Sequence, residues 1–321
     1  MRKLPLKLLF SCAVLALCGS LAMAGDFPDR PVRIIVPFPP GAATDATMRA
    51  VALKLASEWK QPVIIDNKAG LTTGTIAAAA AAPDGYTLLL GTAATMVTTP
   101  MTMAKPTYVV ARDFVPIGRM VTLAPVLVTH PSTGVKSLKE LIAAAKSRPG
   151  ELNFASSGVG TPGHLVMEQL QSMTGIRMLH VPYKGGAPIV SDLVGGQVQF
   201  AMNALPSVLE FIKTGKLVAV AVGQQDRAKA LPQVPTISET VPGFDFTIWY
   251  GLFAPAKTPP EVVAKIGRDL RLALGDAEVV GKLQAQGSDP APSTPQELNQ
   301  QMRKETEQWQ KIIRDRNLQI Q

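Results

Sequence analysis

The stretch from Asn153 to His164 combines residue types that bind anions. It reads Asn-Phe-Ala-Ser-Ser-Gly-Val-Gly-Thr-Pro-Gly-His, a short apolar run followed by small hydroxyl and glycine residues. Pro162 stands where the first turn of a helix accepts proline, since that position needs no N–H donor. Such a turn leaves backbone N–H groups unpaired, and the helix dipole adds positive partial charge. The stretch therefore predicts one half of a site for an anion such as a carboxylate.

A similar turn occurs near the start of the chain. Val32–Val36 predicts a buried strand, and the stiff turn Phe38–Ala43 follows it. A helix is predicted over Ala46–Glu58, with Thr44 or Asp45 as its N-cap. In open α/β sheets, ligands bind beyond the carboxyl ends of the strands, where turns of this kind converge. A third turn, Pro182–Ala187, follows the strand expected at Met178–Val181, and the three turns together favour a binding site over ordinary loops.

Motifs for catalysis, cofactors and metals are incomplete. The segment Gly158-Val159-Gly160 lacks the third glycine of a dinucleotide-binding motif, and no Gly-Lys-Ser/Thr of a P-loop follows it. Ala155 stands where a nucleophile elbow around Ser157 requires glycine. The three histidines lack the HExxH spacing of a zinc site. No catalytic residue, metal or cofactor is expected, and a secreted hydrolase is the less favoured alternative. His164 either contacts the ligand or caps its own loop.

Residues 1–24 have the pattern of a cleaved secretory signal peptide. Basic residues precede the apolar run Leu8–Leu17, and Ala22-Met23-Ala24 precedes Gly25. Both cysteines, Cys12 and Cys18, lie in this segment, so the mature chain is expected to contain no disulfide. Cys18 does not follow a small residue, as a lipoprotein signal requires. We therefore expect export to the periplasm without a lipid anchor.

The charge of the chain excludes one class of partner. The 321 residues carry a formal net charge of +8, which falls to +5 when the signal peptide and its three basic residues are removed. The remaining basic residues are spread along the chain rather than clustered in a stripe with aromatic residues. No nucleic-acid partner is therefore expected, whereas a small anionic ligand is mildly favoured.

Strand and helix patterns alternate along most of the mature chain, which predicts parallel α/β construction. A second unit of the same kind extends over about 129–243, and the aromatic run Phe244–Ala254 predicts a strand that returns to the first unit. Capping boxes at Ser137–Glu140 and Thr294–Glu297 predict two helix starts. We expect a first lobe of residues 25–128 plus 244–321 and a second lobe of 129–243.

Several longer motifs follow one another over nearly the whole mature chain. They are Pro28–Gly41, Pro83–Leu89, Asn153–Gly158, Val181–Gly185 and Trp249–Pro255. Together they resemble the Bug family, the periplasmic solute-binding proteins of tripartite tricarboxylate transporters in Gram-negative bacteria.

The resemblance implies a type II periplasmic binding protein fold of α/β class, with a cleft between two lobes. It implies a monomer that captures a small di-, tri- or aromatic carboxylate by hinge closure and delivers it to the large and small membrane subunits of a transporter. A periplasmic sensor that docks on a signalling receptor binds its ligand in the same way and is the alternative.

The ligand is expected between two loops, one in each lobe, with a third loop at the border of the cleft. The expected binding residues are Phe38, Pro40, Gly41, Ala42, Ala43, Thr44, Asp45, Thr92, Ser156, Ser157, Gly158, Gly160, Thr161, His164, Tyr183, Lys184 and Asn203. The chain departs from the family pattern at two positions. It has Ala42 where family members usually have Gly, and Asn203 where many members have Asp. Asn203 in place of a carboxylate favours a plain or aromatic carboxylate over an amino acid.

Overall fold

The computed structural model describes residues 27–103, 105–183 and 186–315. The predicted signal peptide at 1–24 and the expected binding residue Lys184 lie outside these ranges. Within them, no helix is both long enough and apolar enough to cross a bilayer.

A six-stranded sheet forms the core of the first lobe, with the strand order β11-β4-β10-β3-β1-β2. Its strands are β1 (Val32–Val36), β2 (Val63–Asn67), β3 (Thr87–Thr92), β4 (Phe114–Leu123), β10 (Ile248–Pro255) and β11 (Ser288–Pro290). β10 lies antiparallel between β3 and β4, so the predicted return of the aromatic run is confirmed. β1 pairs in parallel with β2 and with β3, and β4 pairs antiparallel with β10 and β11. The sheet is therefore mixed, whereas the alternation of elements predicted a parallel one.

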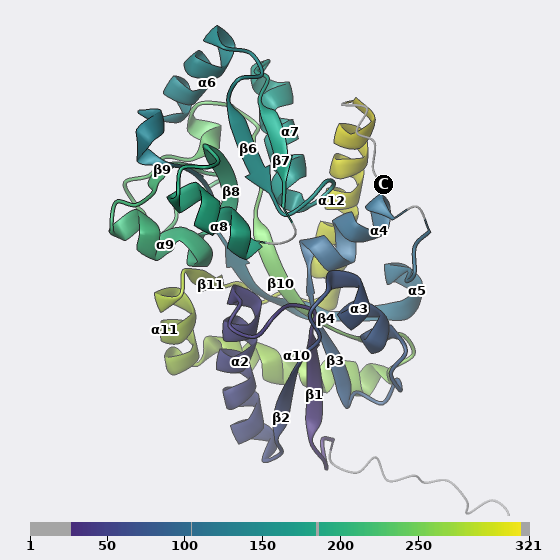
Figure 1. Ribbon diagram of the computed structural model, residues 1–321. Helices are drawn as coiled ribbons and strands as arrows, with labels where there is room; N and C mark the ends of the chain where they lie inside the picture. The colour runs from purple at the N-terminus through teal and green to yellow at the C-terminus, as the bar shows by residue number, and fades with distance from the viewer. Residues whose placement is uncertain (1–26, 104, 184–185, 316–321) are drawn as a thin grey trace, which may run out of the picture.

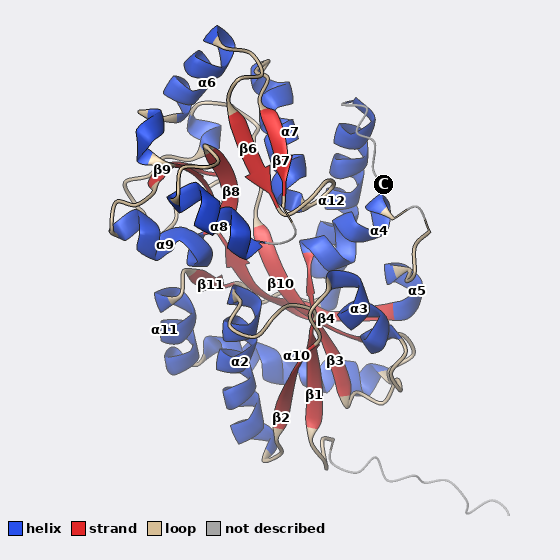
Figure 2. Cartoon of the chain, viewed as in Figure 1, coloured by secondary structure: helices blue, strands red, loops and turns tan. Residues whose placement is uncertain are grey.

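Helices cover both faces of this sheet (Figure 2). They are α2 (Ala43–Trp59), α3 (Leu71–Ala79), the π-helical turn η1 (Ala94–Thr98), α4 (Thr99–Thr102), α5 (Val110–Asp113), α10 (Pro260–Gly275), α11 (Ala277–Ala285) and α12 (Pro295–Asp315). Because side chains alternate along a strand, Leu88 and Leu90 of β3 pack in the cluster with α2 and α10, while Leu89 packs in the cluster with α12. Each face of the sheet is thus buried by a separate apolar layer.

A five-stranded sheet with the order β7-β6-β8-β5-β9 forms the core of the second lobe (Figure 1). Its strands are β5 (Pro125–Thr129), β6 (Asn153–Ser156), β7 (Leu179–Pro182), β8 (Phe200–Ala204) and β9 (Val218–Val222). The helical segments around it are η2 (Pro131–Thr133), α6 (Leu138–Ser147), α7 (Pro162–Thr174), α8 (Gly186–Val194), α9 (Leu205–Lys213) and η3 (Ile237–Glu239). β6 is parallel to β7 and β8, and β5 is antiparallel to β8 and β9. The lobe boundaries at 128/129 and 243/244 stay predictions.

The helix starts show which local sequence signals were sufficient to predict an N-terminus. At α6, the Ser137 hydroxyl accepts the Glu140 N–H at 3.2 Å, so the predicted N-cap is confirmed, but the Glu140 carboxylate accepts the N–H of Lys136 and not that of Ser137. At α12, Thr294 and Glu297 accept each other's N–H groups, which confirms the second capping box. The predicted N-cap of α2 is wrong, because the helix begins after Ala42 without a side-chain cap.

Two chain segments and one helix connect the lobes. Ala124 alone separates β4 from β5, and residues 244–247 lead from the second lobe into β10. The C-terminal helix α12 contacts both lobes: the Gln308 amide donates to Gln169 of α7 at 3.2 Å, and α12 also packs along β4. The hinge is therefore a pair of antiparallel strands with a helix packed across it (Figure 1).

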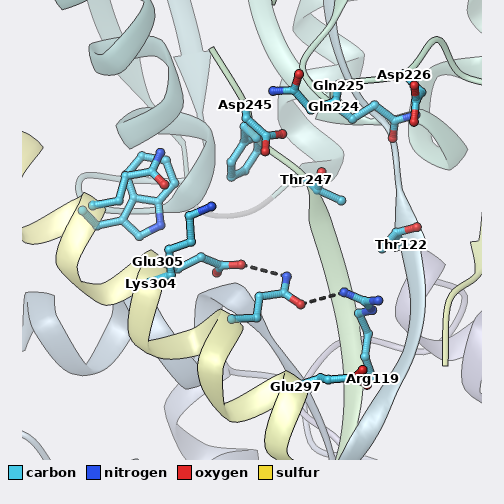
Figure 3. Close-up of a pocket in the computed structure, with 14 residues that line it drawn as sticks. Arg119, Thr122, Gln224, Gln225, Asp226, Asp245, Thr247, Glu297, Lys304 and Glu305 are labelled. Carbon is cyan, nitrogen blue, oxygen red and sulfur yellow. Dashed lines mark hydrogen bonds between the residues drawn. The ribbon is translucent and has the colours of Figure 1, made fainter. Parts of the chain in front are cut away.

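Glu305 of α12 lies at this hinge and is largely buried. The indole N–H of Trp249 donates to both of its carboxylate oxygens, at 2.8 and 3.0 Å. The Gln301 amide donates to Glu305 at 2.9 Å and accepts a hydrogen bond from Arg119 at 2.8 Å, a chain visible in Figure 3. Burial raises the pKa of Glu305 to about 7, against the opposing effects of the Trp249 and Gln301 hydrogen bonds and the Arg119 charge.

This pKa shift predicts a specific dependence of stability on pH. Since the folded state holds the Glu305 proton more tightly than the unfolded state does, stability falls as pH rises from about 4.5 through 7. Glu305→Gln keeps an acceptor for Trp249 but does not titrate. Between about pH 5 and pH 8, the free energy of unfolding measured with urea should therefore fall by about 1–3 kcal/mol more for the wild type than for Glu305→Gln. Parallel curves for the two proteins would contradict the prediction; the exposed Glu307→Gln is the control.

Candidate functional site

The described residues enclose two cavities on opposite sides of the hinge. The rear cavity, of about 520 Å³, lies between α12, β4 and the loop Gln224–Asp226 (Figure 3). It is lined by charged groups of both signs, and its most buried carboxylate, Glu305, already has hydrogen-bond partners. The cleft cavity, of about 210 Å³, lies between the lobes and contains no charged side chain among its described lining residues. The cleft cavity is the candidate site, because two buried polar groups of its lining residues lack partners.

Two residues that line the cleft cavity, one from each lobe, carry a buried side-chain donor without an acceptor. Thr44 Oγ1 comes from the first turn of α2, and the Thr44 side chain is almost fully buried, with 4% of the residue exposed. Asn203 Nδ2 comes from β8 in the second lobe. Neither atom has a hydrogen-bond partner among the described residues. Because an unsatisfied buried polar group destabilises the fold, such groups point to a missing partner.

Two helices begin at the same cavity. Thr44 in the first turn of α2 and Gly163 in the first turn of α7 both line it. The N–H groups of a first turn have no acceptor within their own helix, and the helix dipole gives this end a positive partial charge. An anion in the cavity therefore meets the starts of helices from both lobes, and the described lining residues include no cationic side chain.

The first-lobe loop is held by Asp45, which is not among the residues that line the cavity. Its carboxylate accepts the Gly41 N–H at 2.9 Å, the Arg49 Nε–H at 3.0 Å and the Asn67 amide at 3.0 Å. Burial alone would raise the pKa of Asp45, but the hydrogen bonds from Arg49, Gly41 and Asn67 outweigh it and keep this pKa below its usual value. Asp45 therefore acts as an anionic brace for the loop and leaves the cavity uncharged.

The second-lobe loop satisfies two of its own N–H groups. The Gly158 N–H donates to the Ser156 hydroxyl at 3.2 Å, and the Gly160 N–H donates to His164 Nδ1 at 3.1 Å. Of the two alternatives for His164, the structure has the loop cap. The expectation that the glycine N–H groups point freely toward an anion is therefore wrong for Gly158 and Gly160.

The expected binding residues divide into two groups. Phe38, Thr44, Thr92, Ser156, Ser157 and Asn203 line the cleft cavity. The others within the described ranges lie outside its lining and belong to the supporting loops: Pro40, Gly41, Ala42, Ala43, Asp45, Gly158, Gly160, Thr161, His164 and Tyr183. Tyr183 donates its hydroxyl proton to Asp192 at 2.7 Å, and burial followed by this hydrogen bond raises its pKa to about 12.

Three lining residues of the hinge strand were missed. Phe246, Ile248 and Tyr250 line the cleft cavity, whereas Trp249 between them donates to Glu305 on the other face. Side chains two residues apart point to the same face of an extended chain. The alternation of side-chain direction along the aromatic run could therefore have predicted these residues, once the strand was known to border the cleft.

Comparisons with known proteins agree with this architecture. A family model described as the tripartite tricarboxylate transporter family receptor matches residues 47–318. The protein BugT of Bordetella pertussis is 38% identical over 296 residues, which are 91% of this chain and 91% of BugT.

Two solved structures share the fold at substantial identity. A Rhodopseudomonas palustris protein solved with adipate has a TM-score of 0.83 and 32% identity, and covers 90% of this chain and 98% of its own. The protein MatC of the same species, solved with bound malate, has a TM-score of 0.79 and 29% identity, and covers 89% of this chain and 100% of its own. The chain therefore belongs to the tripartite tricarboxylate transporter receptor family of periplasmic solute-binding proteins, which includes the Bug proteins.

Proposed function

We propose that the protein captures a small carboxylate in the cleft cavity and delivers it to the membrane subunits of a tripartite transporter. The observation that supports this most directly is the pair of unpaired donors, Thr44 Oγ1 and Asn203 Nδ2, on opposite lobes of one cavity. Carboxylate oxygens accept several hydrogen bonds each, and hydrogen bonds to a charged acceptor are stronger than those to a neutral one. A carboxylate thus satisfies both donors at once.

The position of these donors gives closure its driving force. A ligand that meets only the first lobe is held by Thr44 and the start of α2, and closing the hinge adds Asn203 and the start of α7. A ligand shifts a conformational equilibrium only by its extra contacts in the favoured state, so the closed form gains from the second set. Release to a transporter then requires the lobes to separate again.

The lining of the cavity also limits which carboxylates fit. Ile189, Met202, Ile248 and Tyr250 supply apolar walls, and the described lining contains no carboxylate side chain. The α-ammonium group of an amino acid would be desolvated there without a counter-charge, which is costly. The ligand class is therefore a carboxylate with an aliphatic or aromatic body and no ammonium group, in keeping with the adipate and malate bound by the two relatives.

Thr44→Val tests the role of the unpaired hydroxyl. The substitution removes one hydrogen bond to the ligand, so affinity for malate or adipate, whichever binds the wild type more tightly, should fall about tenfold by calorimetry. The stability of the free protein should stay unchanged or rise, because a buried unsatisfied hydroxyl is removed. Thr47→Val is the matched control, since the Thr47 hydroxyl is also buried and unpaired on α2 but lies outside the cavity lining. Equal losses of affinity in both variants would argue against the site.

A matched pair of ligands tests the proposed selectivity. Aspartate differs from succinate by one ammonium group, so the wild type should bind succinate at least about tenfold more tightly in calorimetry. Asn203→Asp replaces a donor by a carboxylate of the same shape, so it should weaken succinate binding. The ratio of succinate affinity to aspartate affinity should therefore fall or reverse. Aspartate binding as tight as succinate in the wild type would contradict the selectivity, and an unchanged ratio in Asn203→Asp would remove Asn203 from the contact set.

A further inference from the structure

Three aromatic rings are stacked beneath the second-lobe loop. The ring centroids of His164 and His180 are 4.0 Å apart at an interplanar angle of 19°, and the Phe154 ring, nearly parallel to both, lies 5.0 Å from His180 and 6.3 Å from His164. The rings come from α7, β7 and β6, the three elements that meet at the loop. His164 is 4% exposed. The stack is therefore a buried part of the fold that the binding chemistry proposed above does not use directly.

Each histidine makes a hydrogen bond to the loop. His164 Nδ1 accepts the Gly160 N–H at 3.1 Å, and His180 Nε2 lies 2.6 Å from the Ser156 hydroxyl oxygen. The same hydroxyl accepts the Gly158 N–H and donates to the Gly158 carbonyl at 2.9 Å. The two imidazoles thus fix both ends of the segment that carries Ser156 and Ser157, which line the cavity.

The hydrogen bond from Gly160 requires an uncharged His164. Since His164 Nδ1 accepts an N–H, it carries no proton, and the ring is the neutral tautomer with its proton on Nε2, 3.8 Å from Glu168. Burial lowers the pKa of His164 to about 4. Burial lowers the pKa of His180 to about 4 as well, with a smaller contribution from His164. Two stacked cations at this separation would also repel each other.

The close contact of Ser156 and His180 resembles a nucleophile with its base, but its geometry is structural. The Ser156 hydroxyl oxygen already accepts the Gly158 N–H, and its proton has an acceptor in the Gly158 carbonyl. A histidine whose pKa falls to about 4 is also a weak base at neutral pH. The pair therefore shapes the loop instead of activating the serine.

We propose that His164 and His180 are positioning residues, which as a neutral stacked pair hold the loop Ser156–Thr161 in the shape that presents Ser156, Ser157 and the start of α7 to the ligand. This inference rests on the proposed carboxylate site, but its structural half concerns the free protein. The loop is then set before the ligand arrives, so binding does not have to order it.

Variants that separate ring shape from hydrogen bonding test the proposal. His164→Phe keeps the stacked ring and loses the acceptor for the Gly160 N–H, whereas His164→Asn places an oxygen near the position of Nδ1. His180→Phe and His180→Gln make the same comparison at Nε2. His130→Asn is the control, because His130 hydrogen-bonds to Ser132 away from the site.

The free proteins are compared first, by amide hydrogen exchange and by the ¹⁵N resonances of the imidazoles. In the wild type, His164 Nδ1 should show the resonance of an unprotonated nitrogen at neutral pH. In His164→Phe, exchange at the Gly160 N–H should accelerate at least about tenfold, and His164→Asn should restore much of the protection. A proton on Nδ1, or unchanged exchange in His164→Phe, overturns the proposal; the ¹⁵N measurement needs no variant to fold.

Adipate binding to the same proteins is measured next by calorimetry. The affinity of His164→Phe and His180→Phe for adipate should fall about tenfold, with recovery in the Asn and Gln variants and wild-type affinity in His130→Asn. Wild-type adipate affinity in both Phe variants overturns the positioning role. Failure of the wild type to bind adipate, malate or succinate contradicts the proposed function instead, and the exchange data on the free proteins still decide what the histidines do.

Discussion

A buried hydrogen-bond donor without an acceptor costs a folded protein about 1–3 kcal/mol, and this chain places two such donors across one cavity. Thr44 is held there by the start of α2 and Asn203 by the pairing of β8 with β5. Both belong to rigid elements, so neither donor is free to turn back and find a partner in its own lobe. The remaining features of the cleft make sense as supports for these two positions.

The two loops at the cavity solve the same problem with different chemistry. In the first lobe the anionic Asp45 takes the Gly41 N–H, and Arg49 balances its charge. In the second lobe a neutral serine and a neutral histidine take the N–H groups of Gly158 and Gly160. Both solutions keep net charge out of the cavity lining and leave the loops ordered without ligand. Each glycine N–H that is bonded within its own loop is no longer available to the ligand, but its hydrogen bond fixes the shape of the loop.

Sequence reasoning succeeded where the structural cause is local and failed where it is tertiary. The N-cap at Ser137 and the capping box at Thr294 depend on residues three positions apart, so the sequence predicts them. The start of α2 has no side-chain cap and was misplaced, because Asp45, a predicted cap, lies inside the helix and is bonded to Asn67, which is distant in sequence. Thr44 and Asn203, which were among the expected binding residues, line the cleft cavity, and their role in binding stays a prediction. Phe246 and Tyr250 were missed because alternation identifies two faces of a strand without saying which one meets the cleft.

The uncharged lining of the cleft cavity has a consequence for how a carboxylate arrives. The field of hydrogen-bond dipoles fades faster with distance than that of a full charge, so these donors attract an anion only at contact. Ionic strength, which screens charges separated by more than about 8–10 Å, should then alter the association rate and affinity little. Binding of the proposed carboxylate then depends on its shape and on the removal of water from its carboxylate groups. The two lobes would select among anions by the size and shape of the part that lies between the charged ends.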